Sequence, residues 1–128
     1  MEQPCRFCRR SPEDIGRVAL ENEYCLFVDT YEHRIPGSGV IIPRAHRRTV
    51  FDLTPEEWMA TQDLLLKAKE RMVRELQPDG FNVGWNCYEV GGQSIPHAHL
   101  HVIPRFADEP FAGKGIRHWL KSEANRRP

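Results

Sequence analysis

The segment from Gln93 to Arg105 constrains the fold more than any other part of the chain. It reads Gln-Ser-Ile-Pro-His-Ala-His-Leu-His-Val-Ile-Pro-Arg, so that histidines alternate with apolar residues at His97, His99 and His101. Successive side chains of a strand point to opposite faces, so this spacing predicts a strand over 95–104 with three imidazoles on one face, about 7 Å apart. Imidazole titrates near neutral pH, binds metals and can attack phosphorus, which makes the row a candidate reaction site. The alternative is a histidine-rich strand that faces solvent, or a surface metal patch.

The rest of the chain predicts four more strands and one long helix. The strands are expected over 17–21, 24–30, 40–43 and 81–86, where apolar or β-branched runs are bounded by turn residues. Thr54-Pro-Glu-Glu57 is typical of a helix start, because Thr54 can cap the helix and Glu57 follows three residues later. Apolar residues then recur at helical spacing and would form one stripe: Trp58, Leu65, Ala68, Met72 and Leu76.

The order of these elements indicates the fold class. A short helix is expected to begin near Ser11, ahead of the first strand, and short loops join several of the strands. This pattern predicts an α+β fold, an antiparallel sheet of about five strands that carries the long helix on one face. We expect a single domain over 1–128, with its core at about 5–105 and a mostly polar tail at 106–128.

Composition and charge narrow the functional classes. Lys plus Arg equals Asp plus Glu, 18 each, so nothing indicates a surface for nucleic acid or another polyanion. The N-terminal end lacks the apolar run of a signal peptide, and no stretch is long and apolar enough to cross a bilayer. We therefore expect a cytoplasmic protein without a membrane partner. Its four cysteines are then more often reduced or metal-bound than paired as disulfides. Trp119 and Leu120 in the tail indicate that the tail docks against something.

Residues 97–103, His-Ala-His-Leu-His-Val-Ile, resemble the motif of the histidine triad family. Gly91-Gly92-Gln93-Ser94 is similar to the glycine-rich stretch that precedes the motif in this family, and the resemblance extends from the N-terminal cysteines to about Arg105. Members are small nucleotide-binding hydrolases and transferases. The resemblance implies a meander of about five strands and a homodimer formed through the long helix and an adjoining strand.

An imidazole can displace a leaving group from phosphorus and form a phosphoramidate that water then hydrolyses. Spacing does not say which histidine attacks, but the resemblance implies that His99 is the nucleophile and that His101 binds the phosphoryl group. It implies cleavage at the α-phosphate of dinucleoside polyphosphates or nucleoside phosphoramidates, with a purine base, through a nucleotidyl-histidine intermediate. A nucleotidyl or adenylylsulfate transferase with phosphate as the acceptor is the runner-up within the enzymes.

Four further residues are expected to contact substrate. Glycines before the triad let the backbone approach an anion, and the amides of Gln93 and Ser94 could point at it. The resemblance implies that Ser94 and Asn86 hydrogen-bond a phosphate or leaving-group oxygen and that Asp29 binds the ribose hydroxyls. Asn86 could equally be a turn residue at the end of its strand, and Asp29 could be a solvated strand end.

Two thiols and two imidazoles are candidates for a metal site. Cys5 and Cys8 form a Cys-x-x-Cys pair, and with His46 and His97 they would make a tetrahedral zinc site of ordinary composition. The resemblance implies the same four ligands, as in the zinc-carrying branch of the family. Four protein ligands leave no open position, so the zinc would be structural. A redox pair or a chance pair of cysteines is the alternative reading of Cys5 and Cys8.

One departure from the family pattern affects the expected activity. Many members carry Pro-Gly-His before the strand at 40–43, whereas this chain has Pro36-Gly37-Ser38. Another histidine, His33, lies nearby in the sequence. The missing imidazole keeps a second functional class open, a nucleotide-binding regulatory module with little turnover. A zinc-organised protein-interaction domain is the third class.

Overall fold

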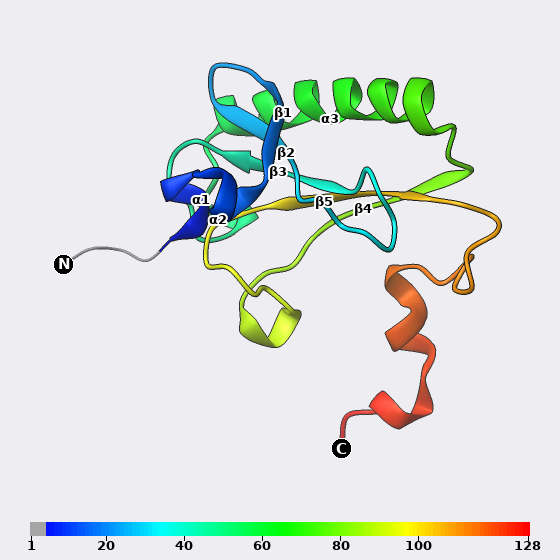
Figure 1. Ribbon diagram of the computed structural model, residues 1–128. Coiled ribbons are helices and arrows are strands. Elements are labelled where there is room, and N and C mark those ends of the chain that lie inside the picture. The colour runs from blue at the N-terminus through cyan, green and yellow to red at the C-terminus, as the bar shows by residue number, and fades with distance from the viewer. Residues whose placement is uncertain (1–4) are drawn as a thin grey trace.

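The computed structural model describes residues 5–128. It is an α+β fold whose five strands form one antiparallel sheet in the order β1-β2-β3-β5-β4 (Figure 1). The strands are β1 (Arg17–Glu21), β2 (Cys25–Asp29), β3 (Gly39–Pro43), β4 (Gly80–Trp85) and β5 (Leu100–Arg105). The predicted fold class is confirmed, and four of the five strands lie within two residues of the predicted ranges.

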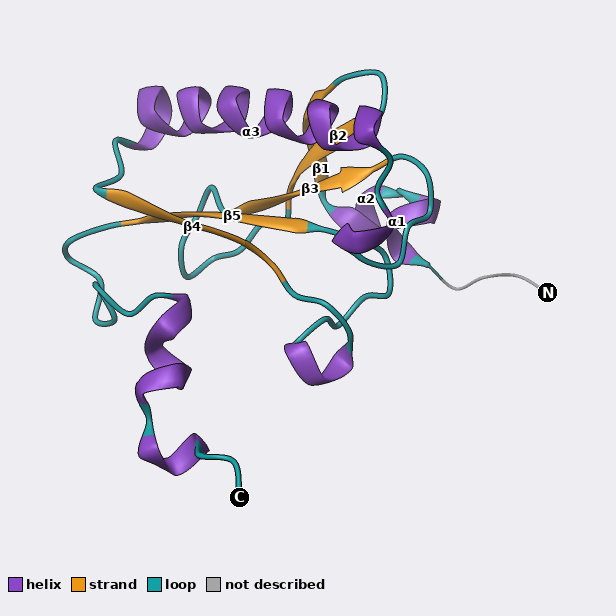
Figure 2. Cartoon of the chain, turned by 180° about the vertical axis from the view of Figure 1, so that it is seen from behind, coloured by secondary structure: helices purple, strands orange, loops and turns teal. Residues whose placement is uncertain are grey.

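The long helix α3 (Pro55–Leu76) covers one face of the sheet (Figure 2). Its start is the capping box that the sequence predicts: the Thr54 hydroxyl accepts the Glu57 amide at 3.1 Å, and the Glu57 carboxylate accepts the Thr54 amide at 2.8 Å. Such a cap stabilises a helix by about 1 kcal/mol. The helix ends where Gln77 takes a left-handed conformation, with φ 53°.

The buried stripe of α3 is centred differently from the prediction. Its buried apolar residues follow a line of four-residue steps: Ala60, Leu64, Ala68 and Met72. Trp58 remains 49% exposed, because it lies on the flank of the helix that meets the edge strand β4, where its ring packs 6.1 Å from that of Trp85. The predicted stripe is therefore right at its C-terminal end and displaced by part of a turn at its start.

Two short helices, α1 (Arg6–Arg9) and α2 (Pro12–Ile15), lie on the other face of the sheet. The helix predicted at Ser11 is α2, whereas α1 was not expected. A second core lies under these helices and is formed by Cys5, Phe7, Ile15, Leu26, Val28, Val40 and Ile42. The alternation along β2 and β3 thus supplies two cores, one toward α3 and one toward the N-terminal segment.

The predicted strand over 95–104 is wrong in its first half, because β5 begins only at Leu100. Pro96 has no amide to donate, and the His97 amide bonds to the nearby Ile95 carbonyl at 2.8 Å. The Ala98 amide donates to the Arg47 carbonyl at 2.7 Å instead of to a neighbouring strand. Of the three triad histidines, His101 alone lies in the strand.

The rest of the described chain is loop, with short 3-10 helices at Val50–Asp52, Glu89–Gly91, Ile116–Lys121 and Glu123–Asn125. The tail leaves the sheet after Arg105, whose guanidinium donates to the carbonyls of Phe111 and Lys114 at 2.9 Å. Trp119 and Leu120 remain exposed, so the docking expected of them is not seen within this chain. Among the helices of residues 5–128, none has the length and apolar character to cross a membrane.

Candidate functional site

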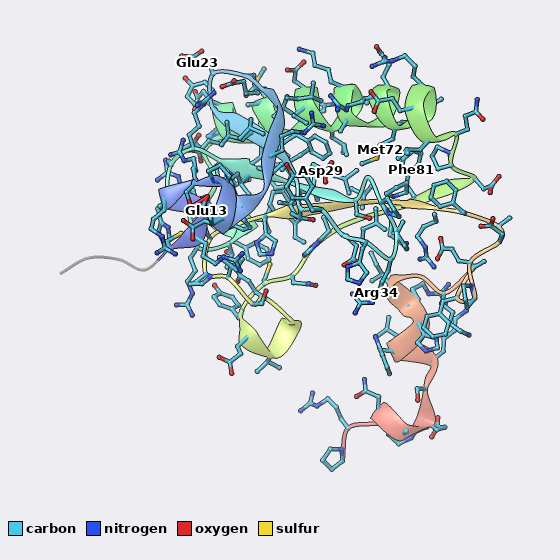
Figure 3. The ribbon with its side chains drawn as sticks, in the orientation of Figure 1. Glu13, Glu23, Asp29, Arg34, Met72 and Phe81 are labelled. Carbon is cyan, nitrogen blue, oxygen red and sulfur yellow. The ribbon has the colours of Figure 1, made fainter. Side chains whose placement is uncertain are left out.

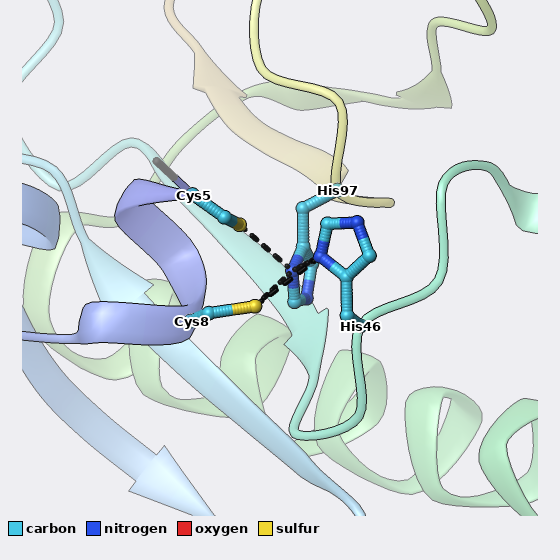
Figure 4. A group of neighbouring side chains, drawn as sticks. All are labelled: Cys5, Cys8, His46 and His97. Carbon is cyan, nitrogen blue, oxygen red and sulfur yellow. Dashed lines mark hydrogen bonds between the residues drawn. The ribbon is translucent and has the colours of Figure 1, made fainter. Parts of the chain in front are cut away.

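Four side chains from three separated segments converge at one end of the sheet (Figure 4). Cys5 is the N-cap residue of α1 and Cys8 lies within that helix, His46 lies in the loop after β3, and His97 precedes β5. Their donor atoms all lie within 4.8 Å of one another. His97 Nδ1 is 3.4 Å from Cys5 Sγ, 3.5 Å from Cys8 Sγ and 3.2 Å from His46 Nδ1. The structure thus brings together the four predicted metal ligands.

These distances fit a tetrahedral zinc ion. With ordinary Zn–N and Zn–S bonds, the edges of the tetrahedron are about 3.3 Å between two nitrogens and about 3.6 Å between nitrogen and sulfur. Burial and the neighbouring Cys5 raise the pKa of the Cys8 thiol to about 11, so two thiolates at this place need a cation beside them. The donor set and its spacing therefore suit a zinc ion.

The tautomer of His97 suits a metal ligand. Its Nε2 donates to the Pro43 carbonyl at 2.9 Å, which leaves the lone pair on Nδ1, the atom that faces the two sulfurs. The side chain is fully buried, and burial lowers its pKa to about 4. His97 is therefore neutral at physiological pH and can bind a cation without losing a proton.

His99 and His101 form a second pair beside this cluster. The Nδ1 atom of His99 lies 2.8 Å from the His97 carbonyl oxygen, an acceptor, so Nδ1 holds the proton and the lone pair is on Nε2. The rings of His99 and His101 lie with centroids 4.9 Å apart. Burial lowers the pKa of both, and in His101 the nearby His99 adds to the effect. A neutral imidazole with a free Nε2 is the form that can attack phosphorus.

Both histidines line a cavity of about 430 Å³ on the side of the sheet away from α3. Its apolar wall comes from Phe7, Ile35, Val40, Ile95 and Ile103. Ser38, Ser94, Glu32 and Arg34 add polar groups, and Arg34 pairs with Glu32 at 3.4 Å. Figure 3 shows Arg34 below the sheet, opposite α3. An apolar wall with a few polar groups beside reactive imidazoles is typical of a small-molecule site.

The predicted substrate contacts lie in different places. Ser94 is exposed in the cavity that holds His99, whereas Asn86 lines a neighbouring cavity of about 290 Å³ together with His101. Gln93 bonds within the protein: its amide donates to the Tyr88 carbonyl at 3.0 Å, and its side chain donates to the Arg48 carbonyl at 2.6 Å. Gln93 thus holds the glycine-rich loop against the loop of His46.

Asp29 lines a different cavity from the two imidazoles. Its carboxylate accepts the Tyr31 amide at 2.9 Å, and it lines a cavity between the sheet and α3 with Met72 and Leu76. The next residue, Thr30, does line the cavity of His99. Asp29 and Thr30, neighbours in sequence, thus line two different cavities.

Ser38 stands where the family resemblance implies a further histidine. Its hydroxyl donates to the Ile35 carbonyl at 2.7 Å, and it lines the cavity. His33 is exposed and is absent from the cavity lining, so it does not replace the missing imidazole.

Sequence reasoning missed Phe7 and Arg34 as parts of the site. An apolar residue between two cysteines was the available signal for Phe7. For Arg34, in a loop rich in charge and proline, there was none.

Comparison with known proteins identifies the family. The protein-family model of the HIT domain matches residues 11–108 of this sequence. The protein Hit of Bacillus subtilis is 30% identical over 103 residues, which cover 80% of this chain and 71% of that protein. The crystal structure of a HIT family protein from Bacillus anthracis superposes with a TM-score of 0.74 at 30% identity, covering 84% of this chain and 77% of that one.

Two more distant relatives have named activities. An adenosine 5'-monophosphoramidase of Saccharomyces cerevisiae is 27% identical over 82% of this chain, and an adenylylsulfatase of Arabidopsis thaliana is 28% identical over 94%. This chain spans 65% and 63% of their respective lengths. A Zn-bound histidine triad family protein from Mycobacterium smegmatis shares the fold, with a TM-score of 0.72 at 23% identity, covering 88% of this chain and 82% of that one. With the family model matched over most of its length and the three histidines in place, the chain belongs to the histidine triad (HIT) family.

Proposed function

We propose that this protein is a nucleotide hydrolase or nucleotidyl transferase that acts at an α-phosphate through a covalent nucleotidyl adduct on His99. One observation carries the proposal: His99 holds its Nδ1 proton on the His97 carbonyl at 2.8 Å, which frees Nε2 beside a cavity of about 430 Å³. A backbone carbonyl can set the tautomer without adding a charge next to an incoming phosphate.

The reaction has two steps on this chain's own groups. In the first, the lone pair of His99 Nε2 attacks the α-phosphorus and the bond from phosphorus to the leaving nitrogen or oxygen breaks. The leaving atom takes up a proton from His101, which the negative charge of the bound phosphate holds in its protonated form although burial lowers its pKa. In the second, water attacks the same phosphorus, the phosphorus–Nε2 bond breaks, and the proton of the water returns to His101. Another nucleophile in place of water makes the second step a transfer.

The substrate classes that we propose are dinucleoside polyphosphates and nucleoside phosphoramidates with a purine base. The apolar wall of the cavity suits a base, and the hydroxyl of Ser94 and the imidazole of His101 suit phosphate oxygens. The yeast relative is a phosphoramidase, which supports the second class. The adenylylsulfatase among the relatives keeps an adenylylsulfate as an alternative substrate. The contacts predicted for Asp29 and Asn86 stay part of the proposal, whereas Gln93, whose amide and side chain bond to the Tyr88 and Arg48 carbonyls, is proposed to act by holding the glycine-rich loop in place.

We further propose that Cys5, Cys8, His46 and His97 hold one structural zinc ion. All four donors come from the protein, so the ion supplies no open coordination position for substrate. Its contribution is to link the N-terminal segment, the loop after β3 and the segment that leads into the triad.

A nucleotide-binding regulatory module with little turnover is a second candidate function. The observation that favours it is Ser38, whose hydroxyl is committed to the Ile35 carbonyl where other members have an imidazole. Such a protein would bind nucleotide in the same cavity without the proton transfers that turnover needs.

A second copy of the chain is the partner that we propose for the flank of α3. Trp58, Met59, Leu65, Val83 and Trp85 line a largely apolar cavity of about 420 Å³ between α3 and the edge strand β4, and Met59 is 71% exposed. Burial of such a patch against its own copy would remove apolar surface from water.

Turnover assays test the proposed function. The zinc-loaded protein is given a diadenosine polyphosphate and an adenosine phosphoramidate, and the His99→Ala variant is compared with the wild type. We expect turnover of at least one substrate by the wild type, a loss of several orders of magnitude in the variant, and AMP binding retained in both. AMP binding without turnover by the wild type would favour the regulatory module, and absence of both would refute a nucleotide function.

A further inference from the structure

Phe7 lies between the proposed metal centre and the proposed nucleophile. It is 4% exposed and sits in α1 between Cys5 and Cys8. Its ring meets the ring of His97 edge-on, with centroids 5.7 Å apart and an angle of 81°. It meets the ring of His99 in the same manner, at 5.2 Å and 65°. One aromatic side chain thus contacts a metal ligand and the nucleophile at once.

Phe7 also forms part of the wall of the cavity that holds His99, His101 and Ser94. A displacement of its ring would change the shape of the apolar wall and would remove the edge contact that restricts the rotation of His99. Packed aromatic pairs of this geometry contribute beyond the area that they bury. The ring therefore has two tasks, to shape the cavity and to hold the imidazole.

The segment that carries Phe7 has little structure of its own. A helix of four residues such as α1 is too short to be stable in isolation. Arg6 and Arg9 bond to Asp14, which belongs to the same N-terminal region. Arg10 donates to the Arg44 carbonyl at 2.9 Å and so provides an anchor to the loop after β3. The two sulfurs on either side of the ring also meet that loop and the triad segment, beside the contacts that the ring of Phe7 makes with His97 and His99.

We propose that Phe7 is a positioning residue through which metal binding at Cys5 and Cys8 strengthens nucleotide binding beside His99. This inference rests on the proposed function and on the four-ligand zinc site. A metal bound by both sulfurs fixes the turn that carries the ring, and the fixed ring holds the cavity wall and the imidazole in the arrangement that accepts nucleotide. Without the metal, the ring keeps its contacts in the second core, but the turn that carries it loses the restraint at both sulfurs.

Coupling of this kind is reciprocal. If zinc raises the affinity for AMP by some factor, AMP must raise the affinity for zinc by the same factor, commonly about 5- to 150-fold. Neither measurement depends on turnover. A residue with a purely structural role would lower stability without changing this ratio, so the ratio distinguishes positioning from stabilisation.

The experiment measures AMP binding to the wild type with and without zinc, and zinc affinity by chelator competition with and without AMP. We expect AMP to bind at least about fivefold more tightly to the zinc-loaded protein, and the same factor in the zinc competition. In Phe7→Leu, which keeps an apolar side chain but loses the ring, we expect zinc to bind and the factor to fall to near one.

The matched control is Phe27→Leu. Phe27 is also buried, but it packs in the core toward α3 and does not line the cavity of His99. This variant should keep the full coupling at a similar loss of stability. If the loss of its metal unfolds the wild type, the chelator competition can still be made, because it starts from folded zinc-loaded protein. It then gives the factor by which AMP changes the zinc affinity of Phe7→Leu and of Phe27→Leu.

The outcomes separate this inference from the function on which it rests. Three results would overturn the inference: equal AMP affinity with and without zinc, full coupling in Phe7→Leu, or no zinc binding at all. In each of these cases, binding of AMP to the wild type would still support the proposed function. If AMP does not bind to the zinc-loaded wild type, the proposed function fails first.

Discussion

Removal of the proposed zinc ion should destabilise the whole domain. The four donors already lie within 4.8 Å of one another, so little binding energy is lost in rearranging them. At free zinc about 1,000 times the dissociation constant, binding contributes about 4.1 kcal/mol to the free energy of unfolding. For a chain of 128 residues the unfolding entropy is about 0.27 kcal/mol/K, so chelation should lower Tm by about 15 °C.

The assay is thermal unfolding followed by circular dichroism, with and without a chelator, alongside metal analysis of the purified protein. We expect close to one zinc per chain. Cys8→Ser should lower Tm by a similar amount and make it insensitive to the chelator. Cys87→Ser is the matched control, since Cys87 is also partly buried but lies outside the cluster. A metal-free wild type with unchanged Tm and oxidisable Cys5 and Cys8 would refute the metal site and favour the redox alternative.

Three further predictions concern the pair that holds the His46 loop, the partner copy and the phosphate contact. Arg47→Met should lower the unfolding free energy in urea by about 3 kcal/mol, because the buried Glu57 carboxylate loses its bidentate partner. Burial alone would raise the pKa of Glu57, but Arg47 and Thr54 hold it below its usual 4.5. The pair therefore stabilises the fold above that pH, and its contribution is lost as the pH falls. An unfolding free energy that falls with acid in Arg47→Met just as it does in the wild type would contradict this. Light scattering should report about twice 14.9 kDa, with Met59→Asp reducing it to one chain, whereas a concentration-independent monomer would exclude the dimer. His101→Ala should lower kcat by less than His99→Ala does, and a larger loss would reverse the two roles.

Local sequence patterns were sufficient to predict most of the fold. The β-branched run at 40–43 became the fully buried β3, and the Thr54 and Glu57 pair became the observed capping box. These features depend on neighbours in sequence, which is why they could be read without a structure. The four metal ligands were predicted because the family resemblance supplied the long-range pairing that spacing alone lacks.

The parts that failed depend on contacts between distant segments. The segment before β5 was predicted as strand from its alternation, but the Ala98 amide pairs with Arg47, about fifty residues earlier, and not with β3 or β4. The positions of Phe7 and Gln93 are likewise decided by partners from other loops. Trp58 was assigned to the buried stripe because helical periodicity does not reveal that this part of the helix lies over the edge strand β4, where the side chain stays half exposed.

Trapping of the nucleotidyl adduct tests the central proposal most directly. Zinc-loaded protein is mixed with substrate labelled at the α-phosphate, quenched within one turnover, and digested. Phosphoramidates are labile in acid, so base-quenched protein should carry the label on the peptide that contains His99, and acid treatment should release it. His99→Ala should carry none while it still binds AMP. Label on another residue, or wild-type turnover by His99→Ala, would contradict a covalent mechanism at His99.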